Sequence, residues 1–119
     1  MKSGDKKYLE HILENIGKIE LSTKGLSLED FKHNDDLMDA TIRRVEIIGE
    51  AVKNLSNEIR EKNIDIEWKK IAGTRDVLIH AYFDVEVDLL WGIIKEDLSE
   101  LKGKIKAILN GEKSKEIRE

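Results

Sequence analysis

The sequence predicts an all-α fold, an up-and-down bundle of four main helices plus a short extra helix. Apolar residues recur at steps of three and four over long stretches, as one buried face of a helix requires. Charged residues make up 39% of the 119 residues, which suits the solvent-facing sides of such helices, and the sequence contains no proline. No strand pattern, internal repeat or linker interrupts these stretches, so we expect helices joined by short connections.

The first helix is expected over residues 5–22, where one face is apolar: Leu9, Ile12, Leu13, Ile16 and Ile19. Gly25 suits the turn that follows. Ser27 and Asp30 have the spacing of a capping box, which predicts a short helix through Lys32. An Asn or Asp of the run 33–36 then caps the next helix.

A long helix is expected over residues 35–61. The residues expected on its buried face are spaced alternately four and three apart: Met38, Ile42, Val45, Gly49, Val52, Ser56 and Ile59. Glycine in the middle of a helix costs up to ~1 kcal/mol relative to alanine. We therefore expect another helix to approach closely at Gly49.

A connector at residues 63–67, with Asp65 as candidate cap, leads to a helix expected over residues 67–81. Phe83 and Asp84 end that helix.

Asp84 then caps a last helix over residues 85–109, which Gly111 ends. The prediction is one domain over residues 1–111, with a frayed tail at 112–119.

The composition excludes several classes of protein. Without cysteine, the chain forms no disulfide and no thiolate metal site. No apolar run approaches the roughly 18 residues of a membrane span, and no signal-peptide pattern follows the N-terminus, so we expect a soluble cytoplasmic protein. The net charge of −4 argues against a domain that holds nucleic acid by long-range attraction.

The chemistry-bearing residues gather in one short run that holds Arg75, Asp76, His80 and Tyr82. An arginine can clamp phosphate and stabilise a developing oxyanion, and a histidine exchanges protons near neutral pH. The pair therefore points to metal-free chemistry on a phosphodiester. The ordinary alternatives are a surface ion pair for Arg75, a helix-end position for His80 and a half-buried phenol for Tyr82.

Helix geometry constrains how Arg75 and His80 can act together. On an ideal helix the two side chains point about 140° apart. Either the helix loosens near His80, or a second subunit completes the site. We favour the second, together with some loosening of the helix, because two-fold pairing along this helix would bring two arginines and two histidines into one cleft. The sequence therefore predicts a homodimer.

The residue pattern of this run resembles the motif of the HepT-like branch of the HEPN superfamily, which is Arg-x4-His-x-Tyr. Arg75, His80 and Tyr82 occupy its fixed positions, while Thr74 and Asp76 stand where the family more often has Met and Asn. The resemblance extends over residues 6–109 and includes three further runs: Tyr8–Leu13, Ile47–Ala51 and Leu90–Trp91.

This resemblance implies an endoribonuclease toxin of a toxin–antitoxin system, with its site at a dimer cleft. His80 would move a proton, Arg75 would stabilise the phosphate and Asp76 would orient one of them, with no cofactor or metal. The substrate would be RNA. A cognate nucleotidyltransferase antitoxin would transfer AMP to Tyr82 and so block the site.

Two other readings stay open: a non-catalytic dimeric helical module that binds a nucleotidyltransferase or a nucleotide, and a purely structural dimer. Lys69 and Lys70 could touch phosphates, although solvated surface is the simpler interpretation. His11 and His33 look like surface and cap residues. Trp68 and Trp91 fit the core.

Overall fold

The computed structural model describes residues 1–74 and 87–118, and within these ranges every regular element is a helix. In chain order they are α1 (Asp5–Thr23), α2 (Leu28–Lys32), α3 (Asp35–Lys53), α4 (Asn57–Lys62), α5 (Trp68–Ala72), α7 (Val87–Gly92), the π-helix η1 (Ile93–Asp97) and α8 (Leu98–Arg118). The described part is therefore all-α, as predicted, while the dimer stays a prediction.

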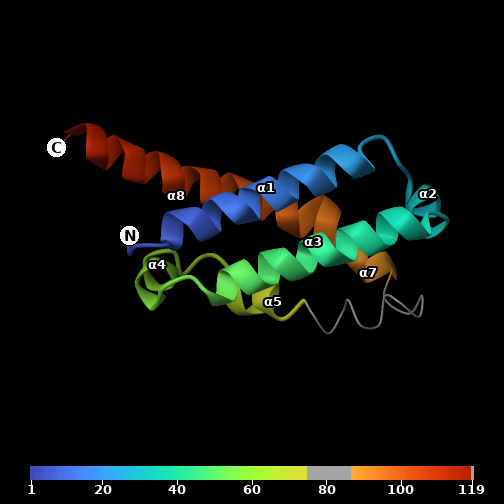
Figure 1. The fold of residues 1–119 in the computed structure, drawn as a ribbon, viewed down its shortest axis with the longest axis horizontal. Helices are drawn as coiled ribbons and strands as arrows, with labels where there is room; N and C mark the ends of the chain where they lie inside the picture. The colour runs from blue at the N-terminus through green and yellow to red at the C-terminus, as the bar shows by residue number, and fades with distance from the viewer. Residues whose placement is uncertain (75–86, 119) are drawn as a thin grey trace.

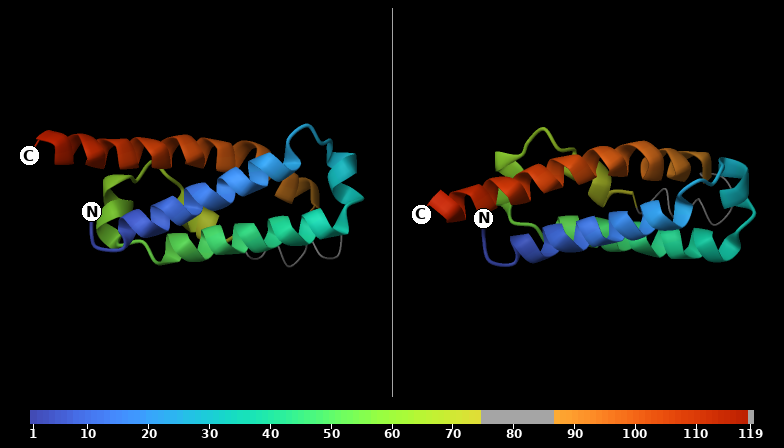
Figure 2. Two further views of the ribbon diagram at one scale, coloured as in Figure 1. Left: turned by 45° about the horizontal axis from the view of Figure 1, so that its top comes forward. Right: turned by 90° about the horizontal axis from the view of Figure 1, so that it is seen from above.

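Helices α1 and α3 lie side by side and run in opposite directions, and the chain turns back between them at α2 (Figure 1). The continuous run of α7, η1 and α8 packs against α1. Figure 2 shows α8 extending beyond the end of the molecule where the N-terminus lies. The molecule measures 52 × 26 × 20 Å.

The core forms where the predicted apolar faces meet. The fully buried apolar side chains of α1 are Leu9, Ile12, Ile16 and Ile19. They share one hydrophobic cluster with α3 and with the last helical run. The members from α3 are Ile42, Val45, Ile48 and Val52, and those from the last run include Leu90, Ile94, Leu98, Leu101 and Ile105. Each such side chain contributes roughly 1.5–3 kcal/mol when it leaves water. Burial of these faces is what holds the three long elements together.

The predicted helix starts in the first third of the chain are confirmed. Ser27 and Asp30 form the capping box, in which the Asp30 N–H donates to Ser27 Oγ (3.1 Å) and the Ser27 N–H donates to Asp30 Oδ2 (3.0 Å). Asn34 caps α3 by accepting a hydrogen bond from the Leu37 N–H at 3.1 Å.

The single helix predicted over residues 35–61 is wrong, because the chain breaks after Lys53 and restarts at Asn57. Ser56 has extended backbone angles and caps α4. The carboxylate of Asp5 accepts hydrogen bonds from the Ser56 N–H (2.9 Å) and the Ser56 hydroxyl (2.6 Å), and the Lys2 N–H also donates to it (3.0 Å). This carboxylate satisfies the backbone N–H that the helix break leaves free.

The helix predicted over residues 67–81 is wrong within the described residues. Helix α5 ends at Ala72, because Gly73 and Thr74 form a turn in which the Thr74 hydroxyl and N–H both donate to the Ile71 carbonyl oxygen.

Two further boundaries differ from the prediction. Asp65 does not cap α5, since Glu67 holds that position without a side-chain hydrogen bond, and Asp65 pairs with Lys104 instead (3.7 Å). The last helix does not end at Gly111, because α8 continues to Arg118 through residues that are good helix formers. The predicted domain limit and the fraying of the tail stay predictions.

The last helical run contains a π-helical turn that the sequence did not predict. In η1, Lys95 reaches back to the end of α1, where its Nζ donates to the Thr23 carbonyl oxygen at 3.3 Å and lies 4.7 Å from the centre of the Trp91 ring. The Trp91 ring packs on Phe31 of α2, with ring centres 5.1 Å apart. The turn thus ties α7 and η1 to the first two helices. Among the described residues, no helix is long and apolar enough to cross a membrane.

Replacement of Asp5 by Asn should destabilise the protein by about 1–3 kcal/mol at pH 7, because an amide NH₂ would face donors that need an acceptor. Burial by itself would raise the pKa of Asp5, but the hydrogen bonds from Ser56 and Lys2 outweigh it and hold the pKa below its ordinary value of 3.8. The stabilisation is therefore complete above that value and is lost as the pH falls through the lower pKa of the folded state.

Urea unfolding of wild type and Asp5→Asn at pH 7 and at pH 3 tests this expectation. The difference in unfolding free energy should shrink at the lower pH. Asp39→Asn, at an exposed position of α3, serves as the matched control. An unchanged difference at pH 3 would contradict the assignment.

Candidate functional site

The four predicted site residues, Arg75, Asp76, His80 and Tyr82, lie outside the described residues, as does the predicted cap Asp84. The structure therefore leaves the predicted site untested. It does describe the elements that lead into this run and out of it, α5 with Gly73 and Thr74 on one side and α7 on the other.

Helix α5 is anchored at its start by Trp68. This side chain is only 6% exposed, and its indole Nε1–H donates to the Asn63 carbonyl oxygen at 3.1 Å. A buried tryptophan needs such an acceptor, so the connector at residues 63–67 fixes the indole as well as the chain direction. The prediction that Trp68 is a core residue is confirmed.

At its other end α5 lies on Gly49 of α3, which confirms the predicted close approach. The position that a β-carbon would take on Gly49 is 3.5 Å from the Ile71 carbonyl oxygen and 3.6 Å from that of Ala72. The turn is closed by Thr74, whose hydroxyl donates to the Ile71 carbonyl oxygen at 2.9 Å and whose N–H donates to the same atom at 3.3 Å. The residue directly before Arg75 is thus tied to α5.

The chain beyond the run enters the core at once. Val87 and Leu90 of α7 are 1% and 0% exposed. Asp88, on the outer side of α7, pairs with Lys32 of α2 at 3.1 Å. The chain is therefore held by packing on both sides of the predicted site.

A hollow of about 620 Å³ lies between α3, α5, η1 and the start of α8. Its apolar lining consists of Val45, Ile48, Ile66, Ile71, Leu89, Ile93, Leu98 and Leu101. The charged side chains along it, among the described residues, are Asp65, Glu67, Lys70, Asp97, Glu100 and Lys104.

Both lysines beside the hollow are paired with carboxylates. Lys70 Nζ lies 3.7 Å from Asp97 and 3.5 Å from Glu67, and these charges, Asp97 first, raise the pKa of Lys70 above its ordinary value. Lys104 lies 3.2 Å from Glu100. With more carboxylates than lysines in its described lining, the hollow suits an apolar group better than a phosphate. The sequence missed this pairing, because Asp97 lies far from Lys70 along the chain.

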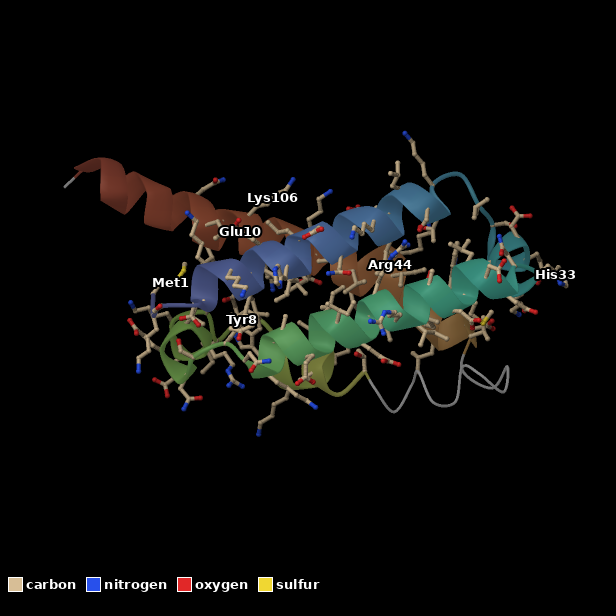
Figure 3. All side chains as sticks on the ribbon, in the orientation of Figure 1. Met1, Tyr8, Glu10, His33, Arg44 and Lys106 are labelled. Atoms are coloured by element: carbon tan, nitrogen blue, oxygen red, sulfur yellow. The ribbon has the colours of Figure 1, made fainter. Side chains whose placement is uncertain are left out.

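The histidines outside the run have ordinary surroundings. His11 is exposed on α1. Figure 3 shows His33 at the opposite end of the molecule from Met1, and its exposed ring lies 3.7 Å from Glu29. No group of metal-ligating side chains occurs within the described ranges.

Comparison with known proteins extends the resemblance seen in the sequence. A family model described as "Ribonuclease HepT-like" matches residues 12–108, a range that includes Arg75, His80 and Tyr82. No solved structure gives a significant match to this protein.

Three relatives illustrate the similarity. A "Putative RNase" of Caldanaerobacter subterraneus subsp. tengcongensis is 48% identical over 106 residues, which cover 89% of this chain and 95% of the relative. A "Probable ribonuclease HepT" of Thermococcus cleftensis is 45% identical over 91% of this chain and 98% of its own length. A "Gamma-glutamylcyclotransferase and putative RNase" of Methanocaldococcus jannaschii is 49% identical over 92% of this chain, which spans only 49% of that longer protein.

Replacement of Trp68 by Ala should lower the unfolding free energy by about 3–5 kcal/mol, since it empties a core position and removes one of the two donors to the Asn63 carbonyl oxygen, the other being the Ile66 N–H. Ile64→Ala, in the same connector but 86% exposed, should change it by less than ~0.5 kcal/mol. Urea unfolding of the two variants beside wild type measures both effects. Equal, small effects would show that α5 is not anchored by Trp68.

Proposed function

The chain belongs to the HepT-like ribonuclease family, and from that premise we propose that it is a metal-independent endoribonuclease. The observation that carries the proposal is the family match across residues 12–108, within which Arg75, His80 and Tyr82 keep the family's spacing. The names of the relatives support RNA as the substrate.

In the proposed reaction the RNA cleaves itself through its own 2′-hydroxyl. The 2′-oxygen forms a bond to phosphorus while the bond from phosphorus to the 5′-oxygen breaks, so the products are a 2′,3′-cyclic phosphate and a 5′-hydroxyl. His80 takes the proton from the 2′-hydroxyl or gives one to the leaving oxygen. Arg75 stabilises the charge on the phosphate in the transition state, and Asp76 orients Arg75 or the histidine ring.

The proposed active form is a homodimer whose two-fold axis brings the two copies of Arg75 and His80 into one cleft. The support is geometric, because one unbroken helix would point these side chains about 140° apart. Pairing two copies would supply both groups from different directions.

The charge of the protein favours brief contact with RNA over tight binding. The net charge is −4, and the lysines along the hollow are already paired with carboxylates. A nuclease needs only to hold its substrate for the time of cleavage, so this charge is compatible with the proposed activity.

We further propose that the protein is the cytoplasmic toxin of a two-gene toxin–antitoxin system. Its partner would be a nucleotidyltransferase that forms a bond between the Tyr82 oxygen and the α-phosphorus of ATP and releases pyrophosphate. The added AMP would block an anionic substrate by charge and bulk.

The second candidate is a non-catalytic dimeric helical module that binds a nucleotidyltransferase or a nucleotide. The acidic net charge favours it, as does the pairing of both lysines beside the hollow, which leaves its described lining without a basic patch for RNA. The two candidates differ in whether purified protein cleaves RNA at all.

Purified protein should cleave RNA in excess chelator and leave cyclic-phosphate ends. His80→Ala should lower the rate by roughly 10²–10⁴-fold and Arg75→Ala by roughly 10²–10³-fold, since one removes the proton carrier and the other the charge on the phosphate. Gel analysis of end-labelled RNA measures the rate and the end groups.

Matched controls are available on the described surface. His33→Ala and Arg43→Ala remove an exposed histidine and an exposed arginine, and both should cleave like wild type. Cleavage that chelator abolishes would contradict the mechanism. No cleavage of any RNA by wild type would favour the binding module.

Co-expression with the proposed partner nucleotidyltransferase should add one AMP to Tyr82 and abolish cleavage, because the adduct occupies the site. The chain has two tyrosines, so Tyr8→Phe is the matched control and should still be modified, whereas Tyr82→Phe should not. Intact mass and peptide mass spectrometry measure the adduct. An adduct on Tyr8, or none, would overturn this part of the proposal.

A further inference from the structure

Helix α3 carries a notch at Gly49, and the last turn of α5 sits in it. The carbonyl oxygens of Ile71 and Ala72 lie 3.5 and 3.6 Å from the place of a β-carbon on Gly49, and Thr74 Oγ1 lies 3.8 Å from it. Figure 1 shows α5 beside the C-terminal part of α3, and the two helices are in contact. Two of the three contacting atoms are backbone oxygens, which cannot turn aside as the end of a flexible side chain can.

The residues on the notch are those that lead directly into the Arg75 run. The Ile71 carbonyl oxygen accepts both the hydroxyl and the N–H of Thr74. Since the chain enters Arg75 from Thr74, any displacement of this turn away from α3 is carried to the start of the run.

We infer that Gly49 is a positioning residue for RNA cleavage, because a residue no larger than alanine at this place lets α5 seat on α3 and so fixes where the Arg75 run begins. The inference rests on the proposed function. It concerns a residue that does not touch the substrate and acts through Ile71, Ala72 and Thr74.

The notch distinguishes side chains by size. A β-carbon at Gly49 would make ordinary van der Waals contact with α5, so Gly49→Ala should be accepted. The γ-carbons of a valine would overlap the two carbonyl oxygens and lift the turn. Gly103 in α8 has nothing within 4 Å of its β-carbon position. Gly103→Val therefore makes the same substitution in a helix at a position where the valine displaces no other residue.

Steady-state RNA cleavage by Gly49→Ala, Gly49→Val and Gly103→Val tests the inference. Displacement of a catalytic group by about 1 Å can cost roughly a hundredfold in rate. Gly49→Val should therefore lose kcat on that scale with KM nearly unchanged, while Gly49→Ala and Gly103→Val keep wild-type values. If Gly49→Val does not fold, kcat and KM are measured on Gly49→Ser instead, and a loss of kcat with KM nearly unchanged is again expected.

A second readout does not depend on activity. The chain has two tryptophans, so NMR shows two indole N–H signals, which Trp91→Phe assigns. The Trp68 signal reports on α5 through its hydrogen bond to the Asn63 carbonyl. It should shift in Gly49→Val and stay in place in Gly103→Val.

The two readouts separate the possible failures. A shifted Trp68 signal with wild-type kcat would overturn the positioning role, and an unshifted signal would overturn the seat itself. Failure of wild type to cleave RNA would overturn the proposed function, and the indole signal would then still show whether Gly49 seats α5.

Discussion

Two helices can bring backbone close to backbone only where the side chain between them is very small, and Gly49 supplies that place between α3 and α5. The contact offsets the cost of glycine inside a helix by letting a five-residue helix dock on a long one. Trp68 anchors the start of the same short helix and Thr74 closes its end. The chain therefore enters the Arg75 run from a fixed direction, although that run itself lies outside the described residues.

The rest of the frame is built from contacts between segments that are far apart in the chain. Asp5 holds the break between α3 and α4, and Lys95 joins the π-helical turn to the end of α1. Both are part-buried polar contacts with their partners satisfied, so they fix geometry as well as adding stability. The charged surface contributes little on average, because exposed ion pairs are worth no more than about 1 kcal/mol.

The sequence predicted what local patterns and hydrophobic periodicity determine: α1, the capping box at Ser27, the Asn34 cap and the approach at Gly49. It failed at the break before Ser56, since the acceptor, Asp5, lies 51 residues away. It also missed the π-helical turn η1. The sign of this turn in the sequence is that the apolar residues Leu90, Ile94 and Leu98 follow one another at intervals of four residues, with no interval of three between them. The candidate site residues were predicted from family spacing rather than periodicity, because spacing along one helix does not bring Arg75 and His80 together, and they lie outside the described residues.

The central claim is that Arg75 and His80 act together across a two-fold axis on RNA. Mixing the two inactive variants Arg75→Ala and His80→Ala, after subunit exchange, tests it most directly. Half of the dimers in a statistical mixture are mixed, and the cleft of each mixed dimer regains one of the two intact Arg–His pairs of wild type. The mixture should therefore recover about a quarter of the wild-type cleavage rate. A mixture that exchanges subunits yet stays as inactive as its components would contradict the account.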